Sequence, residues 1–171
     1  MKKLSSLVAA VSLALIGQAN ADQVTASDKA IKLAKDTILI DTHIDVPYRI
    51  HNKWADVTKA TSDGDFDYPR AVQGGLNAPF MSIYIPANLE FEGKGKSYQL
   101  ANQLIDSMEA IVQRAPSKFA IADSTADIKE QFKQGKMSIA MGMENGSPIE
   151  GDIKNLKHFY ERGVRYITLA H

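Results

Sequence analysis

Two residues that could bind a metal ion lie close together early in the chain, in the stretch ILIDTHIDVPYRI from Ile38 to Ile50. Side chains at positions i and i+2 of a β-strand project from the same face, so we expect His43 and Asp45 to point together, with Asp41 behind them. Burying a carboxylate beside an imidazole on an otherwise apolar strand costs on the order of several kcal/mol unless a cation compensates. The pair predicts part of a zinc-type site, and the alternative is an ion pair at a surface strand end.

Two further candidates follow apolar stretches later in the chain. Glu144 comes directly after IAMGM and before the turn signal Asn145-Gly146, and His171 follows YITLA. The carboxyl ends of parallel strands meet at one face of a sheet, where α/β proteins keep their active sites. We therefore expect His43, Glu144 and His171 to converge. The alternatives are that Glu144 is a solvated turn carboxylate and that His171 is an exposed chain end.

The other histidines and serines give no second constellation. His51 falls in a polar stretch and His158 in the middle of an expected helix, so both are interpreted as surface residues. Ser82 and Ser147 lack the glycine-flanked elbow of a serine hydrolase. No glycine-rich nucleotide loop follows a strand. The chain has no cysteine, so any metal must be bound by His, Asp or Glu.

Composition describes an ordinary globular protein. The 171 residues include 20 basic and 20 acidic ones and are 44% hydrophobic, which excludes a disordered chain and gives no reason to expect a nucleic-acid partner. Residues 1–21 are interpreted as a signal peptide cleaved after Ala21, because two lysines precede an apolar run that ends in a small-x-small site. The run is short for a membrane anchor, so we expect no membrane span after cleavage and a bacterial periplasmic or secreted protein.

Residue patterns predict alternating helices and strands. Helices are expected over 27–38, from a Ser97 cap to Pro116, over 128–134 with a Ser124/Asp127 capping box, and over 152–162. Strands are expected from Ile38 and over 78–86, 137–143 and 164–170, and residues 51–75 as a long loop. This order argues for parallel pairing and an α/β fold. The chain ends at an expected strand without a covering helix, which favours a truncated protein in which 22–171 is the amino-terminal part of the domain.

Four stretches together resemble the membrane dipeptidase (renal dipeptidase) family of zinc metallopeptidases, family M19. They are IDTHIDVPYRI, QGGLNAPFMSIYIP, STADIKEQFKQGKMSIAMGMENG and FYERGVRYITLAH, and they occur in the family's order. The resemblance implies the first half of a (β/α)₈ TIM-like barrel of the metallo-dependent hydrolase type. One departure is Asn145, where many relatives have glycine; asparagine tolerates a left-handed backbone.

What the resemblance implies for the site is specific. His43 and Asp45 would bind one Zn²⁺ ion, and Glu144 would bridge two Zn²⁺ ions and act in catalysis. His171 would contact a dipeptide substrate and stabilise the tetrahedral intermediate. The remaining ligands of the second ion would lie beyond residue 171.

The expected function is therefore that of a zinc-dependent dipeptidase that hydrolyses dipeptides with a metal-activated water molecule. The alternative is an inactive fragment or metal-binding module that retains part of a dinuclear site. A homodimer is left open.

Overall fold

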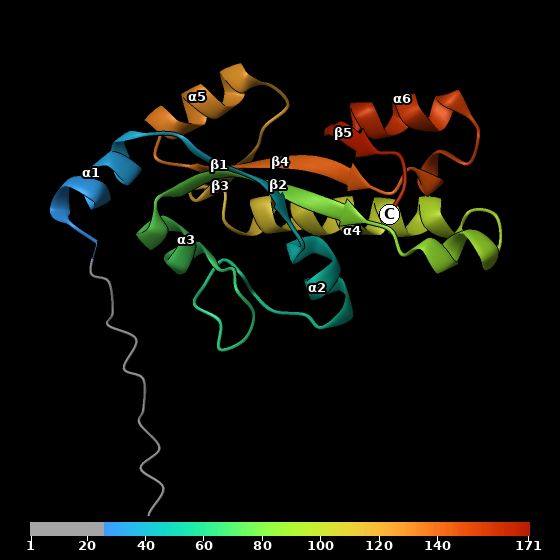
Figure 1. Cartoon of the computed structure of the whole chain (residues 1–171), viewed down its shortest axis with the longest axis horizontal. Coiled ribbons are helices and arrows are strands. Elements are labelled where there is room, and N and C mark those ends of the chain that lie inside the picture. The colour runs from blue at the N-terminus through green and yellow to red at the C-terminus, as the bar shows by residue number, and fades with distance from the viewer. Residues whose placement is uncertain (1–25) are drawn as a thin grey trace, which may run out of the picture.

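The computed structural model describes residues 26–171 (Figure 1). The expected signal peptide at residues 1–21 and its cleavage site after Ala21 lie outside the described residues. Within the described part, no helix combines the length and the apolar character that crossing a membrane requires.

Over residues 26–171, helices and short 3₁₀ turns alternate with five strands. The elements are α1 (Asp28–Asp36), β1 (Leu39–Ile44), α2 (Val46–Asn52), α3 (Tyr68–Gly74), β2 (Leu76–Tyr84), η1 (Ala87–Phe91), α4 (Lys96–Arg114), β3 (Phe119–Ile121), α5 (Thr125–Lys133), β4 (Met137–Glu144), η2 (Ser147–Ile149), α6 (Ile153–Glu161) and β5 (Val164–Thr168).

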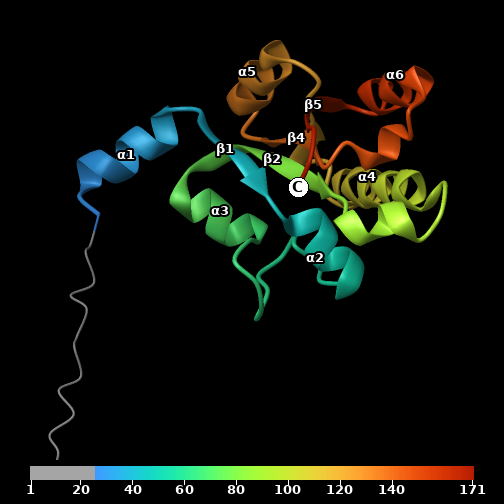
Figure 2. The same ribbon diagram turned by 45° about the vertical axis from the view of Figure 1, so that its right-hand side comes forward.

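Every strand pairing in the sheet is parallel, which confirms the predicted α/β class. The order is β1-β2-β4-β3, and β5 also pairs with β4. Figures 1 and 2 show α5 and α6 above the sheet and α2 and α3 below it. Because these strands run parallel, the carboxyl ends of β1, β2, β4 and β5 lie at the same end of the sheet, so the loops that follow them are neighbours.

Strand β4 gives its two sets of alternate residues different tasks. Met137, Ile139, Met141 and Met143 are buried in the main hydrophobic core, which also contains Leu104, Ile105, Met108 and Ile111 of α4. The intervening residues Ser138, Ala140, Gly142 and Glu144 project from the opposite face, because side chains alternate along a strand. The apolar residues anchor β4 in the core, and the small residues Ser138, Ala140 and Gly142 lie on the face that ends at Glu144.

Both later helices are present as predicted, and side chains cap their first turns. Ser124 Oγ accepts a hydrogen bond from the Asp127 N–H, and the Asp127 carboxylate accepts from Ser124 Oγ and from the Asp123 N–H, so the predicted pair caps α5 although the carboxylate bonds the residue before the N-cap. Asp152 caps α6 by accepting from the Lys154 N–H. Gly163, at φ 96°, turns the chain from α6 into β5.

Residues 51–75 are not the predicted long loop, because they contain the end of α2 and all of α3. Both helices have a proline in the first turn, where the missing N–H has no helical acceptor. Two further expectations are wrong. Helix α4 begins at Lys96 after Gly95, with Ser97 buried inside it, and β3 is a strand that the patterns did not predict.

The Asp67 carboxylate organises the segment that leads into α3. It is 1% exposed and accepts hydrogen bonds from the Thr61 and Arg70 N–H groups and from the Arg70 guanidinium. The Thr61 N–H is the largest cause of the lowered Asp67 pKa, which falls to about 2, while burial opposes the shift and Arg70 adds to it. Asp67 therefore stabilises the folded state as a carboxylate.

We expect Asp67 to make folding stability depend on pH in acid. Its folded pKa lies below its unfolded value of about 3.9, so the unfolded chain binds a proton first as pH falls. Its contribution of up to about 2 kcal/mol is complete above about pH 5 and is lost as pH falls through about 2. Urea unfolding at pH 5 and pH 3 should show a smaller pH-dependent loss in Asp67→Asn than in wild type. The exposed neighbour offers a control, Asp65→Asn, and an equal change in both variants would contradict the assignment.

Candidate metal centre

His43 and Asp45 lie at the junction of β1 and α2. His43 is the second-to-last residue of β1, and Asp45 separates the strand from α2 without capping the helix through its side chain. His43 Nε2 is 3.3 Å from Asp45 Oδ1, although 69% of the Asp45 side chain is exposed. Asp41 turns back instead, and its Oδ1 accepts a hydrogen bond from the His43 N–H. Of the three polar residues, only His43 and Asp45 direct donor atoms to one point. Ile40 of the same strand is 51% exposed, so the apolar residues of this strand are not all buried.

Glu144 brings the end of β4 to the same place. Its side chain is 18% exposed, and its Oε2 lies 3.0 Å from His43 Nε2. Ser82 Oγ of the neighbouring strand β2 donates a 3.0 Å hydrogen bond to this same oxygen. The register explains the contact, because Ser82 pairs with Gly142, two residues before Glu144. Ser82 therefore orients the carboxylate toward His43.

The three side chains have the composition and spacing of a cation site. One imidazole nitrogen and one oxygen from each carboxylate lie within 4.8 Å of one another. Among residues 26–171, the ion pairs of Asp45 and Glu144 are made with histidine, and neither carboxylate meets a lysine or arginine. Two carboxylates that face one imidazole leave negative charge that a divalent cation would neutralise. The residues present therefore fit a metal ion.

His171 lies on the other side of Glu144. It does not end a strand as expected, because β5 ends at Thr168. The imidazole nevertheless reaches the site, with Nε2 3.4 Å from Glu144 Oε1 and 49% of the side chain exposed. Tyr84, the last residue of β2, contacts the imidazole edge to face at 5.0 Å between ring centroids. Glu144 thus faces His43 with one oxygen and His171 with the other.

Tyr166 of β5 contacts the His43 ring on the side opposite Glu144 and Asp45. Its hydroxyl donates a 2.9 Å hydrogen bond to the Thr42 carbonyl and lies 3.4 Å from His43 Nδ1. Burial raises the Tyr166 pKa, and the charges of Glu144, Asp45 and Asp41 raise it further. The hydroxyl therefore stays protonated and remains a hydrogen-bond donor near neutral pH.

Asn145 fixes the backbone directly after Glu144. Its φ is 80°, in the left-handed region that asparagine tolerates. The buried side chain donates to the Ile85 carbonyl and accepts from the Ser147 N–H, and the Asn145 N–H donates to Thr168 Oγ1. These bonds join the ends of β2, β4 and β5, so the Glu144 side chain projects from a rigid base.

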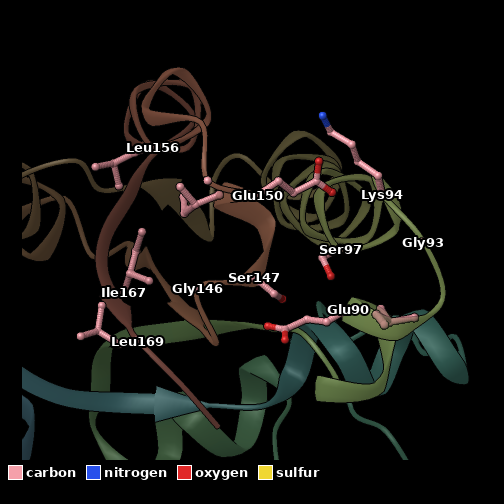
Figure 3. Close-up of a pocket in the computed structure, with 13 residues that line it drawn as sticks. Glu90, Gly93, Lys94, Ser97, Gly146, Ser147, Glu150, Leu156, Ile167 and Leu169 are labelled. Atoms are coloured by element: carbon pink, nitrogen blue, oxygen red, sulfur yellow. The ribbon is translucent and has the colours of Figure 1, made fainter.

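A separate cavity of about 890 Å³ lies beyond this loop (Figure 3). Apolar side chains, including Ile149, Ile167 and Leu169, form part of its wall, and Glu90, Lys94 and Glu150 add charge. None of the four predicted site residues lines it. The cavity is therefore distinct from the cluster around Glu144.

The structure adds three residues to those selected from the sequence. Ser82, Tyr84 and Tyr166 were missed, although a period of two places Ser82 and Tyr84 on one face of β2. His158 was predicted at the surface but is half-buried, with Nε2 2.8 Å from Asn102 Oδ1 and its ring beside Tyr98. The prediction failed because α4 packs against α6. His51 is exposed, as expected.

A parallel α/β sheet with imidazole and carboxylate donors at its strand ends is the framework of a metal-dependent enzyme of the barrel type. The chain belongs to the membrane dipeptidase family (peptidase family M19), whose model matches residues 27–171. This match confirms the resemblance seen in the sequence.

Relatives and solved structures agree with the family. Dipeptidase verJ of Clonostachys rogersoniana is 28% identical over 155 residues, which cover 84% of this chain and 40% of that protein. The probable dipeptidase PvdM from Pseudomonas aeruginosa has a similar fold, with TM-score 0.72, 22% identity, and coverage of 84% of this chain and 37% of that one. A metallo peptidase from Rhodobacter sphaeroides, liganded with a phosphinate mimic of L-Ala-D-Ala, gives TM-score 0.68, 21% identity, and 78% and 45% coverage. The chain spans less than half the length of these relatives.

Proposed function

We propose that this protein is a zinc-dependent dipeptidase. The observation that carries the proposal is the convergence of His43, Asp45 and Glu144, whose donor atoms lie within 4.8 Å of one another in a chain of the dipeptidase family. Zn²⁺ suits this set because it accepts imidazole nitrogen and carboxylate oxygen in small coordination shells. In the proposed role, His43 and Asp45 would hold one ion, and Glu144 would be shared with a second.

In the proposed reaction, the metal ion and Glu144 have different roles. A divalent cation bound here supplies Lewis-acid polarisation of a carbonyl group and lowers the pKa of a water molecule. Glu144 holds its two oxygens toward opposite histidines and is itself held by Ser82. Its position between the histidines suits a group that orients the attacking water against the scissile amide.

His171 is assigned to the substrate. Its exposed imidazole lies beside Glu144 and Tyr84, on the open side of the cluster. An imidazole N–H there would stabilise the oxygen that becomes negative when the amide carbonyl is attacked. The dipeptide mimic bound to the Rhodobacter sphaeroides relative supports a dipeptide as substrate.

A titration with zinc and a peptidase assay test the proposal together. The purified full-length gene product should bind Zn²⁺ in a calorimetric titration and release alanine from L-Ala-D-Ala. His43→Ala should weaken Zn²⁺ binding by more than about 100-fold, since even residues that only support a ligand contribute about 10- to 100-fold. His51→Ala is the matched control, because His51 is exposed. Absence of both binding and hydrolysis in wild type would refute the proposal, and binding without hydrolysis would leave a metal-binding module.

Export to the bacterial periplasm stays a prediction that rests on residues 1–21. It is consistent with a site that uses no cysteine, because thiol ligands oxidise readily in an oxidising compartment.

A further inference from the structure

Tyr166 connects two strands through a single hydroxyl group. The side chain starts on β5 and crosses β4, and its hydroxyl donates to the Thr42 carbonyl of β1 at 2.9 Å. The same oxygen lies 3.4 Å from His43 Nδ1. His43 Nε2, the opposite ring nitrogen, faces Glu144 and Asp45. Tyr166 is thus placed behind the imidazole and the carboxylates in front of it.

The protons available on Tyr166 and His43 decide which of the two groups donates in their contact. A tyrosine hydroxyl has one proton, and here that proton goes to the Thr42 carbonyl. The oxygen can therefore only accept from His43, which requires the proton of a neutral imidazole to be on Nδ1. The Nε2 lone pair is then available to a cation. The two hydrogen bonds, from His43 Nδ1–H to the Tyr166 oxygen and from the Tyr166 hydroxyl to the Thr42 carbonyl, select the tautomer that binds metal through Nε2.

The Tyr166 ring lies over Gly142, where any larger residue would collide with it. Gly142 of β4 pairs with Tyr166 of β5, and a Cβ built on Gly142 would lie 2.0 Å from the ring carbon that bears the hydroxyl. Phe80 of β2 contacts the other part of the ring, with centroids 5.5 Å apart. The ring is held between these residues, so its hydroxyl has a fixed position.

We propose that Tyr166 is a positioning residue for the metal centre, which fixes the orientation and tautomer of His43 through its hydroxyl. The inference rests on the proposed function, because it assigns His43 Nε2 to a metal ion. It goes beyond that function by placing a necessary group on β5, a strand that contributes no proposed ligand. The competing explanation is that Tyr166 only fills space over Gly142.

The variant Tyr166→Phe separates the two explanations, since it keeps the ring and removes the hydroxyl. We expect its Zn²⁺ affinity in competitive titration to fall roughly 10- to 100-fold, the range for loss of a ligand's hydrogen-bond partner. The visible absorption bands of the Co²⁺-substituted protein should shift as well, because the His43 ring is no longer fixed. Tyr160→Phe, which removes an exposed hydroxyl from α6, should leave affinity and spectrum unchanged.

Thermal unfolding of the metal-free proteins completes the test. We expect Tyr166→Phe to melt only slightly below wild type, because the packing over Gly142 is kept and a single hydrogen bond to the Thr42 carbonyl is lost. Equal Zn²⁺ affinity and equal Co²⁺ spectra in Tyr166→Phe and wild type would overturn the positioning role. A lower metal-free melting temperature that accounts for the whole loss of affinity would also overturn it, in favour of packing alone. If wild type binds neither ion, the proposed function fails first, which is a different result.

Discussion

Replacing Glu144 by glutamine is expected to reduce Zn²⁺ affinity by more than about 100-fold and to remove dipeptide hydrolysis. Glutamine has nearly the same shape as glutamate and can still accept the hydrogen bond from Ser82 Oγ. Glutamine lacks the negative charge that the Glu144 carboxylate presents to His43 at 3.0 Å and to His171 at 3.4 Å. The loss would therefore come from charge and donor strength and not from a change in packing.

The same variant should not lower the stability of the metal-free protein. Glu144 lies near Asp45, and among residues 26–171 neither carboxylate forms an ion pair with a lysine or arginine. Removing one negative charge from such a pair relieves repulsion. Thermal unfolding in EDTA should show Glu144→Gln at or above the wild-type melting temperature, and a calorimetric titration measures the affinity. Glu161→Gln, at an exposed ion pair of α6, is the control. A marked drop in metal-free stability would contradict the expected relief of repulsion and would show that the contacts of Glu144 with His43 and His171 stabilise the fold.

Gly142→Ala is expected to damage both the fold and the site. The new methyl group would overlap the Tyr166 ring at 2.0 Å, and β4 cannot move away because β2 and β5 pair with it on either side of this position. The ring must leave, and its hydroxyl then loses Thr42 and His43. We expect the free energy of unfolding to fall by about 1–3 kcal/mol, the usual cost of overpacking a core. Urea unfolding measures this change.

A second substitution shows whether the ring is the cause. In a Tyr166→Ala background, Gly142→Ala should cost much less, because the methyl group then enters the vacated space. Gly74→Ala is the control, since nothing lies within 4 Å of a Cβ added at Gly74. An equal cost of Gly142→Ala with and without the Tyr166 ring would show that the clash is not the reason for glycine at this position.

Local signals predicted much of the fold correctly. Helix α5 was placed by Ser124, whose cap forms within a few residues of sequence, and α6 by the residue pattern over 152–162. Helix α3 was missed because its Asp67 cap and early proline lie in a stretch rich in turn residues. The three residues of β3 are too few for a periodic pattern, and only pairing with β4 makes them a strand.

The site was predictable where it depends on one strand at a time. The spacing of His43 and Asp45 and the place of Glu144 at a strand end follow from the sequence, and the structure brings their donor atoms within 4.8 Å of one another, although Asp45 lies just after β1 and not in it. Ser82 and Tyr166 could not be assigned in this way, because each acts on a residue of another strand through the sheet register. His158 was misjudged for the same reason, since its partner Asn102 belongs to a different helix.

The alternation along β4 has a practical consequence for protein engineering. Its methionines and isoleucine share the hydrophobic core with residues of α4, and Glu144, at the end of the opposite face, reaches the candidate metal centre. Libraries that randomise positions 137, 139, 141 and 143 should therefore yield variants that differ in expression and heat resistance. Positions 138 and 140 lie on the other face of β4 but are only 1% and 2% exposed, so libraries there should be restricted to small residues and should also report on packing.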